Sequence, residues 1–237
     1  MKYKFVKGTA PILGFQDVLS VDFSPKKTCN FDCIYCDVGR TSTWLNERQE
    51  FFTVEEVFDE IENYIIQNGE IKYIMLTGSG EPALFKSFGA LVSLIKKKYP
   101  NIKLMAYTNG SLLSRSDVQS EFTKLDIIGC NLNAVYEKEF RTVTQALEAV
   151  HLRDILDGLL KFKKLFQGVL FVDTKFVHDV NDTERNLDGL IEYINELKPD
   201  KYTIINRKYK GKLLSDEFIA TVKEKSIQLN LPTNILL

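Results

Sequence analysis

Cysteine and histidine are scarce in this chain, with four and two among 237 residues. No apolar run is long enough to span a bilayer, and the N-terminus lacks the basic and apolar segments of a secretory signal. Three of the four cysteines crowd into one stretch, which leaves no even framework for disulfides. Reduced thiols are typical of the cytoplasm, so we expect a cytoplasmic protein without membrane association.

An excess of charge of either sign is also missing. The chain has 31 basic and 32 acidic residues, so bulk electrostatics do not indicate a nucleic-acid or membrane partner. Six prolines and 13 glycines are too few for disorder, and no repeat or linker divides the sequence. With 44% hydrophobic residues, we predict a single domain over residues 1–237, with a core at about 18–206 and a C-terminal extension at 207–237.

Short apolar runs alternate with amphipathic stretches along most of the chain. Six strands are predicted, at residues 18–24, 72–78, 101–110, 124–133, 168–177 and 200–206. Helical spacing occupies residues 54–68, 83–99, 111–121, 136–166 as one or two helices, 181–199 and 215–228, before a short apolar tail. Strands separated by whole helices run parallel through right-handed crossovers, so the order predicts an α/β fold with a curved sheet or barrel and helices outside.

Three of the predicted helices carry capping signals at their starts. Thr53, with Glu56 three residues later, predicts a capping box. A serine is expected to cap the helix at 111–121, and Asn181 or Asp182 is expected to cap a later one.

Polar side chains gather near the C-terminal ends of the predicted strands, the end at which barrel enzymes build active sites. They are Asp22, Ser24, Thr77, Thr108, Asn109, Asn131, Asn133, Asp173, Lys175 and Asn206. The alternative is that such residues cap the helices that follow, a common role for Asn, Asp, Ser and Thr.

Cys29, Cys33 and Cys36 have a spacing that lets their thiolates converge on one metal centre. Soft sulfur ligands select zinc, copper(I) or iron-sulfur clusters. A closed zinc site needs a fourth ligand, and the candidates are poor. Cys130 has the opposite strand parity to its polar neighbours, which predicts a core position, and the two histidines lack a paired spacing.

The three cysteines, with Tyr35 just before the last, resemble the signature of the radical S-adenosylmethionine (SAM) superfamily. The resemblance implies a partial (β/α)6 TIM-type barrel. It also implies that the three thiolates hold one [4Fe-4S] cluster, whose fourth iron is left for SAM. The fourth cysteine alone is too little for a second cluster.

Two further stretches resemble motifs of that superfamily. Residues 77–82, TGSGEP, resemble its "GGE" turn, which receives the amino group of SAM, although the same letters also make an ordinary strand-to-helix turn. YTNGSLL resembles its "TNG" turn. Tyr35 is expected beside the adenine of SAM or packing the loop onto the barrel. The cofactor-binding residues expected from the resemblance are Tyr35, Gly78, Ser79, Gly80, Glu81, Thr108, Asn109, Asn131, Asn133 and Lys175.

A closer resemblance runs from about Asp22 to Lys201. KTCNFDCIYCDVGRT, LTGSGEPAL, AYTNGSLL and LKPDK are similar to stand-alone iron-sulfur oxidoreductases related to wybutosine-type tRNA-modifying enzymes. The chain departs from that group at residues 131–134, where NLNA replaces "SLDA", and it lacks the "NRP" stretch that follows. Amides still bond ribose hydroxyls or a carboxylate but carry no charge.

The resemblance implies an enzyme that cleaves SAM reductively to a 5'-deoxyadenosyl radical, which abstracts hydrogen from a substrate. A low-potential donor, flavodoxin or ferredoxin, would supply the electron. The candidate substrates are tRNA or another macromolecule. The alternatives are an activase of a glycyl-radical enzyme, a peptide-modifying enzyme and, from another class, a non-catalytic iron-sulfur redox sensor.

Two sets of charged residues near the expected site, a pair on one strand and a basic run after the last strand, each have two possible interpretations. Asp173 and Lys175 share one strand face and would form a charged pair near the substrate if that face is the lumen. The basic run from Arg207 to Lys212 lies beyond the last predicted strand. It is interpreted either as a solvated loop or as a grip for a phosphate or an acidic peptide.

Overall fold

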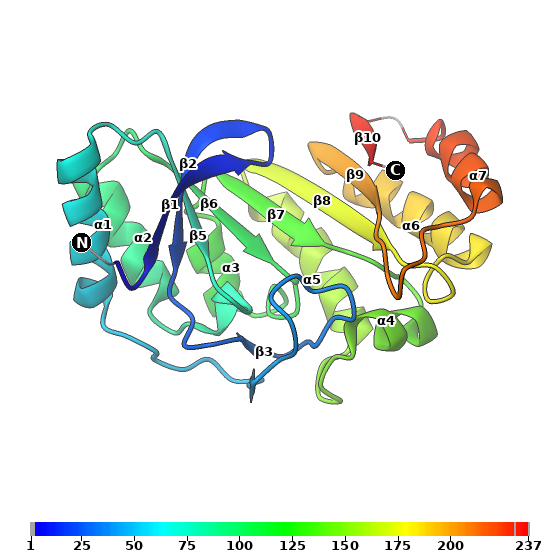
Figure 1. Cartoon of the computed structure of the whole chain (residues 1–237), viewed down its shortest axis with the longest axis horizontal. Helices are drawn as coiled ribbons and strands as arrows, with labels where there is room; N and C mark the ends of the chain where they lie inside the picture. The colour runs from blue at the N-terminus through cyan, green and yellow to red at the C-terminus, as the bar shows by residue number, and fades with distance from the viewer. Residues whose placement is uncertain (1–2, 230, 237) are drawn as a thin grey trace.

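The computed structural model describes residues 3–229 and 231–236 and contains an eight-stranded sheet with helices packed against it (Figure 1). The strand order is β1-β2-β5-β6-β7-β8-β9-β10; β1 is antiparallel to β2, and the other neighbours are parallel. The strands are β1 Val6–Ile12, β2 Phe15–Asp22, β5 Tyr73–Thr77, β6 Lys103–Thr108, β7 Ile127–Asn131, β8 Val169–Phe176, β9 Lys201–Asn206 and β10 Thr233–Leu236.

The helices connect consecutive parallel strands, as the crossover rule requires. They are α1 Val54–Asn68, the 3-10 turn η1 Pro82–Leu84, α2 Phe88–Lys98, α3 Ser116–Phe122, α4 Glu137–Thr144, α5 Leu152–Leu165, α6 Glu184–Leu197 and α7 Asp216–Ser226. A separate pair of two-residue strands, β3 Thr28–Cys29 and β4 Thr43–Trp44, lies beyond the end of β2. None of the helices in the described ranges is long and apolar enough to cross a membrane.

Strand alternation divides the apolar side chains between two faces of the sheet. One face packs with the helices in the main core, which includes Leu19, Ile74, Leu104 and Ile128. The other face lines the lumen and forms a smaller cluster of Val18, Met75, Met105 and Ile127. The sheet is curved but not closed, because its edges β1 and β10 pair with no further strand of the described chain. The predicted α/β partial barrel is confirmed.

The hairpin of β1 and β2 covers the N-terminal end of the lumen. Phe15, at the start of β2, lies 4.8 Å from Tyr73 and 6.4 Å from Phe171, measured between ring centroids. Figure 1 shows the connecting loop of this hairpin extending across the sheet. The cavity described below lies at the opposite, C-terminal end of the strands.

All six predicted strands form, but the sequence prediction missed two others of the eight-stranded sheet and the short pair β3 and β4. β1 was overlooked, and the apolar tail is the strand β10, which pairs in parallel with β9. Residues 136–166 divide into α4 and α5.

The predicted capping box of Thr53 and Glu56 is confirmed, whereas two other caps were wrong. The N-cap of α6 is Thr183, whose hydroxyl accepts from the Asn186 backbone N–H. No side chain caps α3, which begins only at Ser116. Asn181, predicted as a cap, is instead fully buried and bonds the loops around it.

Candidate active site

The cysteine loop, residues 27–42, lies at the C-terminal end of β2 and is held by two neighbouring elements. The Glu81 backbone N–H, after β5, donates to the Thr28 carbonyl at 3.0 Å. On the other side, the N–H groups of Asp32 and Ile34 donate at 2.9 and 3.1 Å to carbonyls at the end of α4. The loop is thus fixed between β5 and α4 by main-chain bonds.

A buried carboxylate also shapes the cysteine loop from within. Asp32, 3% exposed, lies 2.8 Å from the Arg40 guanidinium and 3.5 Å from the Lys27 ammonium. It also accepts from the Thr41 N–H at 2.7 Å. A buried charge is tolerated only when it is paired in this way. Sequence reasoning did not identify this cluster, since isolated charges in a loop carry no periodic signal.

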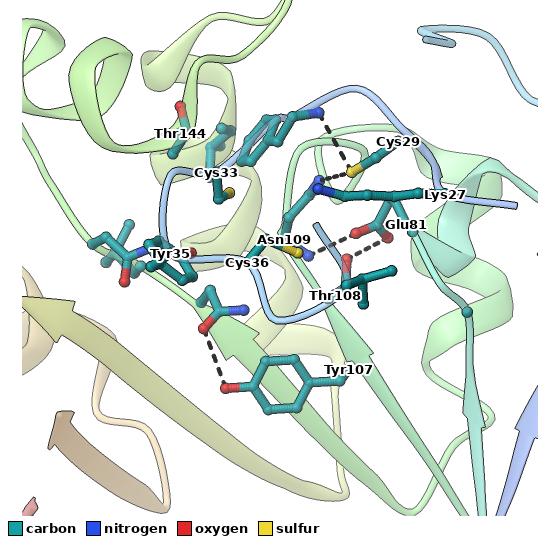
Figure 2. Close-up of a pocket in the computed structure, with 18 of the residues that line it drawn as sticks. Lys27, Cys29, Cys33, Tyr35, Cys36, Glu81, Tyr107, Thr108, Asn109 and Thr144 are labelled. Carbon is teal, nitrogen blue, oxygen red and sulfur yellow. Dashed lines mark hydrogen bonds between the residues drawn. The ribbon is translucent and has the colours of Figure 1, made fainter. Parts of the chain in front are cut away.

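The three cysteines of the loop line one cavity of about 280 Å³ (Figure 2). Cys29 is 8% exposed, and burial raises its pKa to about 12. Burial likewise raises the pKa of Cys33 to about 11. These two thiols are therefore protonated near neutral pH unless a metal displaces the protons. Cys130 is fully buried in the main core, as its strand parity predicted.

Gly80 allows the turn after β5 to approach the cysteine loop. A Cβ at this position would lie 1.7 Å from the Thr28 carbonyl oxygen, and one at Gly78 would lie 2.0 Å from the Ser24 hydroxyl. Ser79 donates to Asp22 from its N–H at 3.0 Å and from its hydroxyl at 2.5 Å. The glycines thus serve the packing of two protein loops against each other.

The Glu81 carboxylate joins the ends of β5 and β6. Oε1 accepts from the Ala83 N–H at 3.0 Å and the Thr108 hydroxyl at 2.7 Å, and Oε2 accepts from the Asn109 N–H at 2.7 Å. The side chain is 2% exposed, and burial raises its pKa to about 7 despite the three donors. Thr108 is therefore occupied in holding Glu81.

The floor of the cavity carries a phenol that sequence reasoning missed. Tyr107 points into the lumen, where its hydroxyl donates to Asp173 and lies 3.4 Å from Asn131 Oδ1. A Cβ at Gly129 would lie 2.3 Å from the Tyr107 ring, so that glycine makes room for it. The parity of Tyr107 with Met105 was the available signal.

Asp173 and Lys175 both lie on the lumen side of β8, and no ion pair joins their side chains directly in the described part of the chain. Asp173 accepts from Tyr107, whereas the Lys175 ammonium donates to Asn131. The ammonium also lies 5.6 Å from the Tyr35 and Tyr107 ring centroids, and burial lowers its pKa. The two charges are held apart by intervening polar groups.

Asn133 connects the floor of the cavity to the cysteine loop. Its Nδ2 donates to the Tyr35 hydroxyl at 2.5 Å, and its Oδ1 accepts from the Lys175 N–H at 2.7 Å. Its own carbonyl accepts from the fully buried Asn181 and Asn186 at 2.8 and 3.1 Å. Tyr35 thus lies in the cavity with its hydroxyl fixed, and its contact with adenine stays a prediction.

The basic run after β9 contains two residues in ion pairs, Arg207 and Lys212, and two exposed lysines, one of which, Lys210, lies 5.2 Å from the Tyr209 ring centroid. Arg207 pairs with Asp37 of the cysteine loop, and Lys212 lies 3.2 Å from Asp179. Lys208 and Lys210 are exposed. Neither of the two expected interpretations of this run is tested by these contacts.

Comparison with known proteins places the site in context. The family model of the radical SAM superfamily matches residues 23–191. A UPF0026 protein of Methanocaldococcus jannaschii is 30% identical over 196 residues, which are 82% of this chain and 60% of that protein. The chain spans between 36% and 61% of the length of the first few curated relatives it matches.

Two solved structures share the fold at low sequence identity. A radical SAM methyltransferase from Sphaerobacter thermophilus superposes with a TM-score of 0.65 and 14% identity, covering 92% of this chain and 65% of that one. Archaeal TYW1 superposes with a TM-score of 0.59 and 14% identity, covering 90% and 72%.

Proposed function

The chain belongs to the radical SAM superfamily, and from that premise we propose that it binds one [4Fe-4S] cluster through Cys29, Cys33 and Cys36 to cleave SAM reductively. Membership makes it an enzyme of radical SAM type. The observation that carries the specific proposal is that the three cysteines and the Gly78–Glu81 turn line the same cavity.

The donor set fits such a cluster in kind, because all three ligands are thiols that line one cavity. Thiolates are the ligands that iron-sulfur clusters take, and a closed zinc site would need a fourth ligand in addition to these three. A cluster held by Cys29, Cys33 and Cys36 would supply the single electron that reductive cleavage of SAM requires.

The residues around the cysteines would orient SAM and exclude water. Glu81 Oε1 is saturated by two donors, but Oε2 accepts only one among the described residues, which leaves an acceptor position for the SAM ammonium. Tyr35 would lie beside the adenine. An apolar part of the cavity wall is formed by Phe31, Ala134, Phe140, Leu152 and Ile155. Such a wall keeps bulk water from a reactive intermediate.

We propose tRNA as the substrate class, with an external reductant such as flavodoxin or ferredoxin, which radical SAM enzymes generally need. The support is the sequence resemblance to tRNA-modifying enzymes and the exposed Lys208 and Lys210. Arg207 of the same loop pairs with Asp37 of the cysteine loop, so residues 207–212 begin next to that loop. Phosphate contacts of this kind predict an affinity for tRNA that falls steeply with salt.

Cluster assembly and SAM binding test the proposal directly. The protein is reconstituted anaerobically with iron and sulfide, reduced with dithionite and examined by electron paramagnetic resonance before and after SAM is added. We expect a cluster signal that SAM changes, its loss in Cys33→Ala, and its retention in the matched core variant Cys130→Ala. A cluster that ignores SAM would favour the redox-sensor alternative, and equal iron in Cys33→Ala would contradict the ligand assignment.

A further inference from the structure

The side chain of Asn109, in the turn after β6, has hydrogen-bond partners at every position. Its Oδ1 accepts from the Ser111 N–H at 2.9 Å and the Ser111 hydroxyl at 2.6 Å. Its Nδ2 donates to Asn30 Oδ1 at 2.9 Å and to the Cys29 sulfur at 3.7 Å. An amide with two donors and two acceptor sites is fully used by this set.

The hydrogen-bond partners of Asn109 allow only one orientation of its side-chain amide. A backbone N–H only donates, so the atom facing the Ser111 N–H has to be the Asn109 oxygen. The NH₂ group then necessarily faces the Cys29 sulfur. The amide therefore presents a hydrogen-bond donor, with its positive end, to that sulfur (Figure 2).

A second, buried asparagine holds this arrangement. Asn30 is fully buried and donates from its Nδ2 to the Ser111 hydroxyl at 2.8 Å, which closes a ring of three side chains. Its carbonyl accepts from the Leu147 N–H at 2.9 Å, which ties the ring to the segment after α4. Buried polar networks of this kind rotate only at the cost of leaving a group unpaired.

Cys29 consequently has two N–H donors, because the Phe31 N–H also lies 3.4 Å from its sulfur. Donors aimed at a cluster sulfur stabilise negative charge on it. Reduction adds one negative charge to the cluster, so such donors favour the reduced form and raise the reduction potential.

We infer that Asn109 is a positioning residue whose amide raises the reduction potential of the bound cluster through the Cys29 sulfur, and that Asn30 and Ser111 set its orientation. This inference rests on the proposed function, since it requires a cluster on Cys29. Its consequence is that an electron donor can reduce the cluster at a higher potential than it could without the Asn109 amide.

The test is a redox titration of the reconstituted cluster, followed by visible absorbance and electron paramagnetic resonance without SAM. Asn109→Leu removes the donor without adding charge, and Asn109→Asp replaces it with an oxygen. We expect both to lower the ratio of reduced to oxidised cluster at a fixed potential by about tenfold, which is 59 mV for one electron. Ser111→Ala, which keeps Asn109 but frees its orientation, should shift the potential in the same direction by less.

Cys130→Ala serves as the control, with an unchanged potential expected because its side chain lies in the main core. Bound cluster with an unchanged potential in both Asn109 variants would overturn the inference while leaving the proposed function intact. If both variants lose the cluster, Ser111→Ala decides: a lowered potential supports the inference and an unchanged one overturns it. A wild-type protein that binds no cluster would overturn the proposed function and the inference together.

Discussion

Apolar side chains fill the N-terminal end of the lumen, whereas buried and partly buried polar side chains line the cavity at its C-terminal end. Val18, Met75, Met105 and Ile127 meet at the first end under the β1–β2 hairpin. At the second end, Glu81, Thr108, Asn109, Asn133 and Asp173 each have at least one hydrogen-bond partner from another element.

This difference suggests that the apolar end contributes mainly to the stability of the fold, whereas the polar end fixes the positions of the groups around the cavity. Apolar burial is non-directional, so a change at the N-terminal end should cost stability and leave the cavity in place. A hydrogen-bonded group fixes a position, so a change at the C-terminal end should displace or unpair its neighbours. The cysteine loop depends on that second end, because it packs on the turn after β5.

The largest effect is expected for Gly80→Ala at the polar end. The new Cβ would meet the Thr28 main chain, which has to move, so we expect loss of cluster binding measured as iron per folded chain. Gly78→Ala is the matched control. Its Cβ would meet the Ser24 hydroxyl, which has no hydrogen-bond partner in the described part of the chain and is able to rotate, so most iron should be retained. Full iron in Gly80→Ala would refute the loop contact.

Met105→Ala is the corresponding change at the apolar end. The side chain is fully buried, so truncation should lower the free energy of unfolding by about 2–5 kcal/mol, measured by urea denaturation. The iron bound per folded chain should equal that of the wild type. A variant of normal stability, or one that folds but binds no iron, would contradict the separation of the two ends.

Glu81 makes the polar end sensitive to pH. Its pKa is raised from 4.5 to about 7, so the folded state binds its proton more tightly than the unfolded state. The free energy of unfolding of the metal-free protein should therefore fall as pH rises from about 4.5 to about 7, by at most about 3 kcal/mol. Glu81→Gln should abolish this fall in urea titrations across that range. Parallel pH profiles for the two proteins would rule out the buried carboxylate as the cause.

Tyr107→Phe should have the smallest effect, because it removes one hydroxyl between the two ends. Asp173 then loses the donor of its buried hydrogen bond, which should cost about 1–3 kcal/mol of unfolding free energy. The double variant with Asp173→Asn measures the coupling. Strictly additive single effects would mean that the two side chains do not interact.

The sequence predicted those parts of the structure that depend on hydrophobic periodicity or on residue spacing. Six strands, their connecting helices and the cysteine spacing all follow from local patterns. β1 and β10 were missed because edge strands need little burial: β1 contains Gly8 and Pro11 and is largely exposed, and β10 has only four residues.

The polar end was predictable in composition but not in detail. The strand-end rule located Asn109 and Asn133, yet their partners Asn30, Asn181 and Asn186 come from other segments and have no periodic signal. Tyr107 was passed over because an aromatic residue in a strand is ordinarily a core residue.

Formation of 5'-deoxyadenosine tests the central claim, that the polar end carries radical SAM chemistry, most directly. The reconstituted wild-type protein is reduced anaerobically with dithionite and given SAM, and the product is quantified by chromatography. The account predicts that wild type and Cys130→Ala each form 5'-deoxyadenosine and methionine in a one-to-one ratio. Cys33→Ala should form neither product. Wild-type protein that holds its cluster but forms no 5'-deoxyadenosine above the buffer background would contradict it.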